Sequence, residues 1–294
     1  MEMNVKMIEE ILAPYEAVCF DAYGVLNNYN GLIPGINETI DFLEQKGKQS
    51  LVLTNDASRN PEQLAAKYQK RGIHALGPEK IISSGMLAQE YMRHKVTDGL
   101  VAYLGTAQSK YYIESLGLNA IAIRDVDLEQ IDEISAMVFL DDEGFDWDQD
   151  LSKTVNLLRK TNIPTIVANT DLKYPVSKSH VNIAIGAIAN MIEGIVGKKF
   201  LHFGKPDTQM FLFAYQRLNE QQFVEKHKVL MVGDTLETDI LGGNKFGFDT
   251  ALVLTGNTLA HKAELRIRSK GIIPTHLIQS AGIGNKIQFF PSKL

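Results

Sequence analysis

Short apolar runs that alternate with helical patterns are the feature that most constrains the fold of this 294-residue chain. Such alternation is typical of a parallel β-sheet flanked by helices. Five runs predict strands of one central sheet, at Val18–Phe20, Ser50–Leu53, Leu201–Phe203, Val229–Val232 and Ala251–Leu254. Polar residues follow almost all of these runs, and ligands of open α/β sheets bind outside the carboxyl ends of the strands. The sequence therefore predicts an α/β protein with a site at one edge of its sheet.

The middle of the chain contains a second set of such patterns. Strands are predicted at Val101–Leu104, Ala136–Leu140 and Thr165–Ala168, and a helix at Trp147–Arg159. We therefore expect a Rossmann-like, doubly wound parallel-sheet core formed by residues 1–95 and 200–294. An α/β cap domain, residues 96–199, would be inserted into that core.

The two ends of the chain give shorter patterns. A short N-terminal helix that ends at Pro14 is predicted from the helical spacing of Val5, Ile8, Ile11 and Leu12. From Gly256 to Leu294 the pattern predicts a helix followed by a strand near His276–Ile278.

Composition and local sequence patterns argue against several classes of protein. The net charge of -5 and the lack of a basic run argue against nucleic-acid binding. The most apolar stretch is interrupted by Asn182, Asn190 and Glu193, which argues against a membrane span. Cys19 is the single cysteine, so the sequence predicts no internal disulfide and a buried thiol in a reducing compartment. With no signal-peptide pattern at the N-terminus, we expect a soluble, cytoplasmic protein, and we leave a homodimer open.

The first polar residue at a predicted strand end is Asp21, in the segment CFDAYGVL. A carboxylate at such a position can act as a nucleophile if its surroundings keep it ionised and aim it at an electrophile. Tyr23 stands two residues later, where a second carboxylate would serve as acid and base.

Two further strand ends offer groups that suit a phosphoryl oxygen. Thr54 and Asn55 supply a hydroxyl and backbone N–H groups, and Lys205 supplies a positive charge. Each segment also has a simpler interpretation. Thr54 and Asn55 could cap the helix that starts near Pro61, and a lone Gly-Lys-Pro tripeptide is weak evidence.

Two more carboxylates, Asp234 and Asp239, lie in the segment VGDTLETDI. Together with Asp21 they would repel one another unless a cation or protons compensate, and oxygen ligands of this kind suit Mg²⁺. The alternative is that Asp234 caps a helix and Asp239 is a solvated helix residue. We expect His202 to be a packed residue and His180 to lie in an exposed linker, and no Cys/His cluster predicts zinc.

Taken together, CFDAYGVL, LVLTNDASR, HFGKP and VGDTLETDILGGNKFGFDT, in this order, resemble the haloacid dehalogenase superfamily. The pattern is most similar to its phosphatase branch with an inserted α/β cap, which includes sugar-phosphate and nitrophenyl-phosphate phosphatases. The resemblance covers nearly the whole chain, and the insertion lies between the second and third motifs, as in that branch. It implies a phosphatase that acts on a small phosphorylated metabolite, with a sugar phosphate as one candidate.

The resemblance also implies roles for individual residues. Asp21 would form an aspartyl-phosphate and would ligate Mg²⁺ together with the backbone carbonyl of Tyr23 and the carboxylate of Asp234. Asp239 would act through water or by orienting Lys205.

The same resemblance places Thr54, Asn55 and Lys205 on the phosphoryl oxygens, where they would stabilise charge. In the cap, the segment VANTD implies that Asn169 and Asp171 read the substrate, and VFLDDEGFDW resembles a neighbouring cap segment. Asn169 and Asp171 could equally be turn-forming residues.

Tyr23 departs from the phosphatase pattern, which usually has aspartate at this position. A phenol is a poor base at neutral pH, and a lost general acid/base typically costs about 10²–10⁴-fold in rate. Two alternatives follow: a catalytically weak relative that binds a phosphorylated ligand, or a metal-independent 2-haloacid dehalogenase, which has tyrosine there. The GD…TD segment and the large cap favour the phosphatase. Tyr23 could also simply fill space between core and cap.

Overall fold

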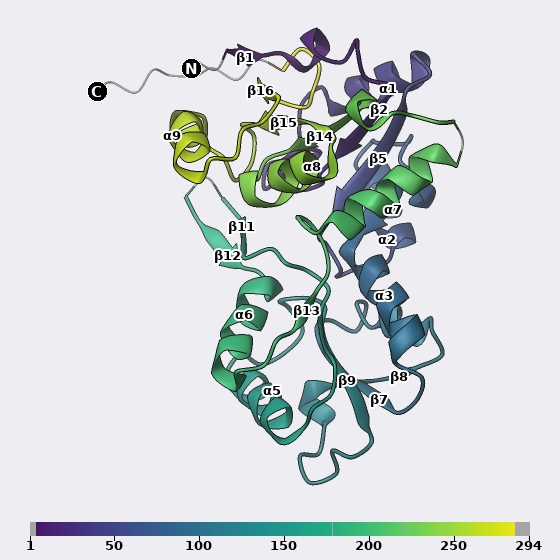
Figure 1. Ribbon diagram of the computed structural model, residues 1–294, viewed down its shortest axis with the longest axis vertical. Helices are drawn as coiled ribbons and strands as arrows, with labels where there is room; N and C mark the ends of the chain where they lie inside the picture. Colours follow the sequence, from purple (N-terminus) through teal and green to yellow (C-terminus); the bar gives the residue numbers. More distant parts are fainter. Residues whose placement is uncertain (1–3, 178, 221, 286–294) are drawn as a thin grey trace.

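The computed structural model describes residues 4–177, 179–220 and 222–285, which form two parallel sheets with helices packed against them (Figure 1). Neighbouring strands of the seven-stranded sheet are parallel throughout. The strands, in spatial order, are β1 (Val5–Lys6), β16 (His276–Ile278), β15 (Asp249–Val253), β14 (Val229–Gly233), β2 (Ala17–Phe20), β5 (Gln49–Thr54) and β6 (Ile81–Ser83). The α/β architecture predicted from the sequence is confirmed.

Alternate side chains of the central strands face two layers of helices. Val18 and Phe20 of β2 pack in one apolar cluster with α1 (Ile36–Gln45) and α2 (Pro61–Lys70). Cys19, between them, belongs to a second cluster with α3 (Ser84–Lys95) and α7 (Thr208–Asn219). The remaining helices of this half are α8 (Leu241–Phe246) and α9 (Ala260–Lys270). This alternation is expected of strands that are buried on both faces.

The second sheet has five parallel strands. In spatial order they are β13 (Leu201–His202), β10 (Thr165–Val167), β9 (Ile134–Phe139), β7 (Leu100–Leu104) and β8 (Asn119–Ala122). Helices α5 (Gln149–Lys160) and α6 (Ile185–Val196) cover one face, while α3 and α4 (Tyr111–Glu114) pack toward the other.

Two small antiparallel hairpins complete the fold. The first, β3 (Asn27–Asn28) and β4 (Gly31–Leu32), follows β2. The second, β11 (Lys173–Pro175) and β12 (Val181–Ile183), leaves the second sheet and reaches toward the first near α9 (Figure 1). We call the second one the cap hairpin.

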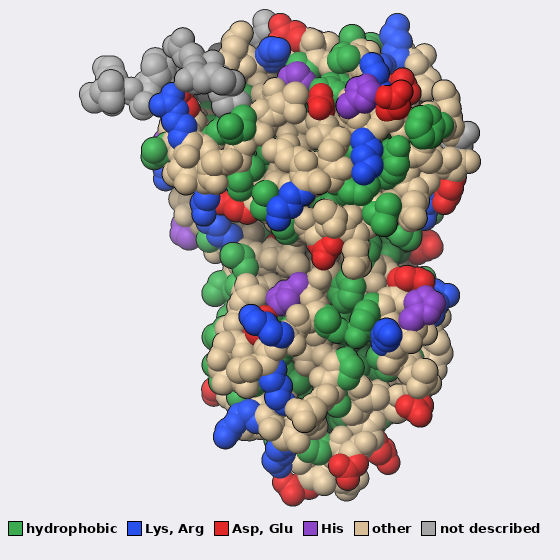
Figure 2. Space-filling view, viewed as in Figure 1, with side chains coloured by type: hydrophobic (Ala, Val, Ile, Leu, Met, Phe, Trp, Pro, Cys, Tyr) green, Lys and Arg blue, Asp and Glu red, His purple; other side chains and the backbone are tan. Residues whose placement is uncertain are grey.

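One apolar cluster is shared by the two sheets. Cys19 and Leu53 of the first sheet, Ala88 and Met92 of α3, and Val101 of the second sheet all belong to it. Figure 2 shows a narrower waist between the two lobes, and α3 crosses it on one side of the molecule (Figure 1). The lobes are therefore joined by packing as well as by the chain.

Two predictions about individual elements are wrong. The strand predicted at Leu201–Phe203 does not join the central sheet, because Leu201 and His202 pair with β10 in the second sheet. A short apolar run predicts a strand but not which sheet that strand joins. The predicted N-terminal helix is instead the edge strand β1 and a short 3₁₀ helix at Ile8–Glu10, since Val5 pairs with Leu277.

The other predicted elements lie close to their expected places. The helix predicted at Trp147–Arg159 is α5, and the last strand is β16; residues 286–294 of the predicted tail lie outside the described part of the chain. The division into core and cap remains a proposal, and β13 would move its second boundary to about residue 203. Among the described residues, no helix is both long and apolar enough to cross a membrane.

Candidate active site

The predicted site lies where three neighbouring parallel strands end. Asp21 follows β2, Thr54 ends β5, and Asp234 follows β14. Because β2 pairs with both β14 and β5, these residues come to one edge of the sheet. The backbone N–H of Asp21 continues the ladder and donates to Val232 O at 2.9 Å. The backbone pairing of the sheet thus positions Asp21 independently of side-chain contacts.

Lys205 is buried at the centre of this site, with 2% of its surface exposed. Its Nζ lies 2.5 Å from Asp21 Oδ1 and 2.7 Å from Asp239 Oδ1, and it donates to Leu53 O at 2.9 Å. Burial alone would lower the pKa of Lys205, but Asp21 and Asp239 outweigh it and raise the pKa above its usual range. Lys205 is therefore held as a cation against the two carboxylates.

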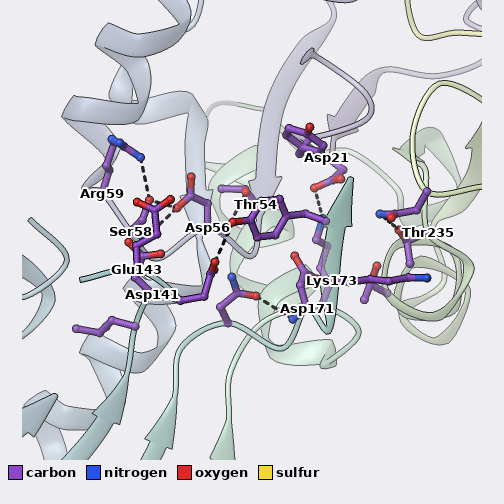
Figure 3. A pocket seen from close by; sticks show the side chains of 18 of the residues that line it. Asp21, Thr54, Asp56, Ser58, Arg59, Asp141, Glu143, Asp171, Lys173 and Thr235 are labelled. Carbon is purple, nitrogen blue, oxygen red and sulfur yellow. Dashed lines mark hydrogen bonds and ion pairs between the residues drawn. The ribbon is translucent and has the colours of Figure 1, made fainter. Parts of the chain in front are cut away.

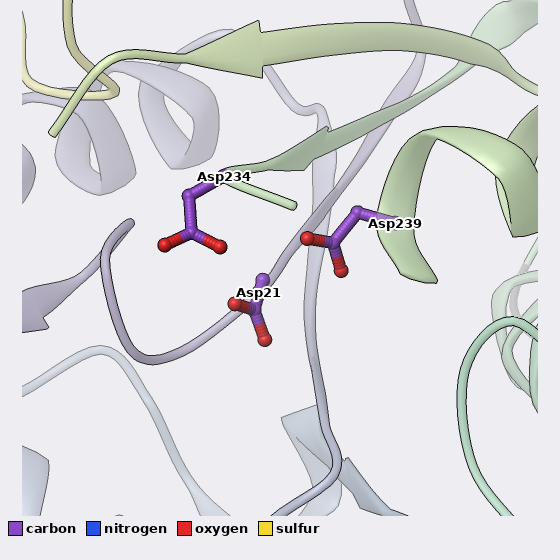
Figure 4. Close-up of side chains that lie close together, drawn as sticks. All are labelled: Asp21, Asp234 and Asp239. Atoms are coloured by element: carbon purple, nitrogen blue, oxygen red, sulfur yellow. The ribbon is translucent and has the colours of Figure 1, made fainter. Parts of the chain in front are cut away.

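Three carboxylates converge at this edge of the sheet (Figure 4), and two of them contact Lys205. Asp21, Asp234 and Asp239 each offer an oxygen within 4.8 Å of the others. Burial raises the pKa of Asp21 well above its usual range, and burial together with Asp239 raises that of Asp234 to about 6. Two buried acids, a third that is partly buried, and one lysine leave an excess of negative charge, so the donor set fits a divalent cation with a preference for oxygen ligands.

Glycines leave the space that the carboxylate of Asp234 occupies. It accepts hydrogen bonds from Thr235 Oγ1 at 2.7 Å and from the backbone N–H of Asn257 at 2.6 Å. A Cβ atom at Gly24 or Gly256 would lie 2.1 Å or 1.8 Å from Asp234 Oδ2. Both positions must lack a side chain for Asp234 to point into the site.

Asp239 is fully buried, so its interpretation as a solvated helix residue is wrong. It lies in a short π-helix, Leu236–Ile240, and Oδ2 accepts from the backbone N–H of Thr235 at 3.1 Å. This contact turns the other oxygen toward Lys205, as the prediction that Asp239 orients Lys205 requires.

Thr54 and Asn55 are both buried and do not cap the next helix. That helix, α2, is capped by Asn60, whose side chain accepts from the backbone N–H of Gln63 at 2.8 Å. The side chain of Asn55 instead accepts from the backbone N–H of Lys205 at 2.8 Å. It also donates to Thr170 Oγ1 at 3.0 Å and to Asp171 Oδ1 at 2.9 Å, and so ties the site to the cap.

The two predicted cap residues differ in what they do. Asn169 forms a turn, because its Oδ1 accepts from the backbone N–H of Asp171 at 2.8 Å. Asp171 reaches Asn55, and burial raises the pKa of Asp171 despite the opposing effect of Lys205. Asn169 and Asp171 both line the cavity, so residues of this loop form a turn and also lie at the site.

A cavity of about 330 Å³ lies between the core residues and the cap. Figure 3 shows Asp21 and Thr54 from the core together with Asp141 and Asp171 from the cap. Lining residues for which the sequence predicted no individual role are Asp56, Ser58, Arg59, Lys67, Thr106, Gln108, Leu140, Asp141, Asp142, Glu143, Lys173, Tyr174, Thr235, Thr238 and Asn257. Four of them, Leu140 to Glu143, lie in the segment VFLDDEGFDW, which the sequence indicated only as a whole as part of the cap. Burial, followed by the charge of Asp142, raises the pKa of Asp141 to about 7.

A pattern in the sequence could have identified part of this set. Asp141 and Asp142 come directly after the run that forms β9 and Leu140, just as Asn169 follows the run of β10. The rule of strand ends applies to the second sheet as well. Lys173 and Tyr174, in the cap hairpin, carry no comparable pattern.

The remaining predictions concern residues away from the chemistry. His202 is partly buried and pairs with Glu193 through Nε2 at 2.8 Å. His180 is exposed at the turn of the cap hairpin, where Ser177 and Ser179 contact its Nδ1. Cys19 is a buried free cysteine, and burial raises the pKa of its thiol to about 12.

Comparison with known proteins places this arrangement in a family. Sequence models described as haloacid dehalogenase-like hydrolase and HAD-hydrolase-like match residues 18–119 and 202–280. A solved structure described as a possible sugar phosphatase of the HAD superfamily, from Cytophaga hutchinsonii, is 53% identical in sequence. It superimposes with a TM-score of 0.92, and the match covers 97% of this chain and 100% of that one.

Curated relatives agree with this result. Chronophin of Bos taurus is 28% identical over 93% of both chains. The chloroplastic phosphoglycolate phosphatase 1A of Arabidopsis thaliana is 26% identical over 85% of this chain and 71% of its own. The fold, the site and these relatives define a hydrolase of the phosphatase type. The chain belongs to the haloacid dehalogenase superfamily.

Proposed function

We propose that this protein is a Mg²⁺-dependent phosphatase that hydrolyses a small phosphorylated metabolite through an aspartyl-phosphate on Asp21. The observation that carries the proposal is the contact of Asp21 with the buried Lys205, beside Asp234 and Asp239, at a cavity large enough for a small substrate. From the sequence we also propose a cytoplasmic location and no nucleic-acid or membrane partner. A homodimer is left open.

Magnesium would be held by Asp21, Asp234 and the backbone carbonyl of Tyr23. The excess negative charge of the carboxylates supports this assignment, because it needs a hard cation to balance it. When bound, Mg²⁺ would neutralise charge on the phosphoryl oxygens.

Residues of the protein would carry out the attack on phosphorus and bind the phosphoryl oxygens. Asp21 would attack phosphorus while the ester oxygen leaves with its electron pair, and water would then release phosphate from the acyl phosphate. Lys205 and Thr54, with backbone N–H groups near Asn55, would bind the phosphoryl oxygens and stabilise their charge. Asp239 would keep Lys205 directed at Asp21. Position 23 holds no carboxylate to protonate the leaving group, which supports slow turnover.

The cap half of the cavity favours a leaving group that donates hydrogen bonds. Among the described cap residues that line it, four are acids, Asp141, Asp142, Glu143 and Asp171, and one is a lysine, Lys173. Carboxylates accept hydrogen bonds from hydroxyl groups and repel other carboxylates. This lining supports a sugar or polyol phosphate over a carboxylate-bearing substrate such as phosphoglycolate.

Phosphate release from a metabolite panel, with Mg²⁺ and with EDTA, tests the function. We expect metal-dependent release, with kcat/KM for sugar phosphates about tenfold or more above that for phosphoglycolate, because an unpaired buried charge is costly. Binding without release would support the catalytically weak relative. Metal-independent halide release from 2-haloacids would replace the phosphatase by a dehalogenase.

Gly256→Ala tests the placement of Asp234 for metal binding. Its added Cβ would lie 1.8 Å from Asp234 Oδ2, so the carboxylate must move. We expect the Mg²⁺ concentration for half-maximal activity to rise about tenfold or more, as when groups that orient a metal ligand are lost. The matched control is Gly194→Ala, where a Cβ meets nothing within 4 Å. Equal Mg²⁺ dependence of the two variants would show that Asp234 does not bind the metal.

A further inference from the structure

The loop that carries the proposed nucleophile also touches the cap. Tyr23 lies two residues after Asp21, and its hydroxyl donates a hydrogen bond to the backbone carbonyl of Pro175 in the cap hairpin. The rings of Tyr23 and Tyr174 meet edge-on, with centroids 6.4 Å apart and 74° between their planes. Tyr23 therefore connects the core to the cap by a hydrogen bond and by a ring contact.

The core side of this connection is well fixed. Within the loop, the backbone N–H of Gly24 donates to Asn27 O at 2.6 Å, and that of Leu26 donates to Ala22 O at 2.9 Å. The backbone of Tyr23 itself bridges to Asn27. Backbone hydrogen bonds therefore hold in place the loop that carries the Tyr23 side chain.

The cap side leads directly into the cavity. Tyr174 donates from its hydroxyl to Asp142 Oδ2 at 2.8 Å and accepts from Asn182 Nδ2 at 3.4 Å. Lys173, Tyr174 and Asp142 all line the cavity. The position of the cap hairpin therefore decides how Lys173 and Tyr174 meet a substrate, and whether Tyr174 reaches Asp142.

The hydroxyl of Tyr23 has a single proton, and it is directed to Pro175. It cannot at the same time protonate a leaving group. An ionised aspartate at position 23 would have no proton to donate to that carbonyl. Tyrosine at this position therefore provides a contact that the usual carboxylate could not form.

The connection lies across the molecule from the shared apolar cluster. Helix α3 joins the two lobes on one side, and the cap hairpin approaches the core on the other (Figure 1). We propose that Tyr23 is a positioning residue that holds the cap hairpin over the active site and so sets Lys173 and Tyr174 against the substrate. The inference rests on the proposed phosphatase function.

Steady-state kinetics of Tyr23→Phe with a sugar phosphate, in the presence of Mg²⁺, test the proposal. Phenylalanine keeps the ring but loses the hydrogen bond to Pro175. We expect KM to rise about five- to tenfold, as for one lost hydrogen bond, with kcat changed less than about threefold. The pH profile of kcat should keep its shape. A fall in kcat of about 10²-fold or more with unchanged KM would overturn the proposal, because it would identify Tyr23 as the proton donor.

Hydrogen exchange of the backbone amides gives a second readout that needs no activity. We expect amides of the cap hairpin, such as that of Val176, to exchange several-fold faster in Tyr23→Phe than in the wild type. The matched control, Tyr29→Phe, removes a hydroxyl from a more exposed tyrosine nearby and should change neither KM nor exchange. Equal exchange in the wild type and Tyr23→Phe would overturn the positioning role. A wild type without phosphatase activity would overturn only the proposed function.

Discussion

Asp21→Asn should reduce phosphate release by about 10⁴-fold or more, as is found when a nucleophile is removed from an active site. The substitution keeps the shape of the side chain but removes the charge that must attack phosphorus. Neither of the other two carboxylates of the cluster can replace it, because Asp234 is directed to Thr235 and Asn257, and Asp239 to Thr235. Single-turnover and steady-state phosphate release with Mg²⁺ measure the loss.

The variant should remain folded, so that the loss can be assigned to chemistry. Burial and neighbouring acids raise the pKa of Asp21, which means that its ionised form is costly in the folded protein. We therefore expect the melting temperature of Asp21→Asn to lie within about 4 °C of the wild type. Asp98→Asn makes the same change at an exposed site and should keep full activity. Substantial activity in Asp21→Asn would contradict the aspartyl-phosphate.

Lys205→Met should have the largest effect on stability. It removes the cation that contacts Asp21 and Asp239 and leaves the carboxylates buried without compensation. Breaking a buried ion pair in this way typically costs about 3–5 kcal/mol of unfolding free energy. Loss of its charge from the phosphoryl oxygens should also lower kcat by about 10²–10³-fold. Denaturant melts in EDTA and phosphate-release assays measure the two effects.

A double variant separates the two roles of Lys205. Lys205→Met combined with Asp239→Asn removes one of the repelling carboxylates, so part of the lost stability should return while activity stays low. Added Mg²⁺ should stabilise the single variant, because an ion that binds only the folded state stabilises it. The control, Lys199→Met, changes a lysine whose side chain is 97% exposed and should cost at most about 1 kcal/mol. Wild-type stability of Lys205→Met in EDTA would show that the carboxylates do not need this cation.

The sequence predicted the centre of the site well because that centre follows from strand order. Asp21, Thr54 and Asp234 each follow an apolar run, and parallel strands bring their carboxyl ends together. Lys205 was predicted at the site although the strand before it was assigned to the wrong sheet. Its place depends on the buried contacts with Asp21 and Asn55, and these do not require β13 to join the central sheet.

The rest of the cavity could not be predicted from local patterns. Lys173 and Tyr174 lie on a short hairpin whose position depends on Tyr23, 150 residues or more away in the sequence. No sequence pattern indicates the role of Gly256 either, because that role is to leave room for the side chain of Asp234. Contacts between distant segments leave no periodic pattern of apolar residues in the sequence from which they could be predicted.

The apolar cluster shared by the two sheets bears on how such a protein can change over evolution. An inserted domain with its own separate interior can be lengthened, exchanged or lost while the host remains folded. Here Val101 and Val138 of the insertion pack in the same cluster as Leu51 and Leu53 of the host. Deleting the insertion would expose part of the interior of the host to water. Substitutions at the lining of the cavity, rather than replacement of the whole cap, are therefore the accessible route to a new substrate.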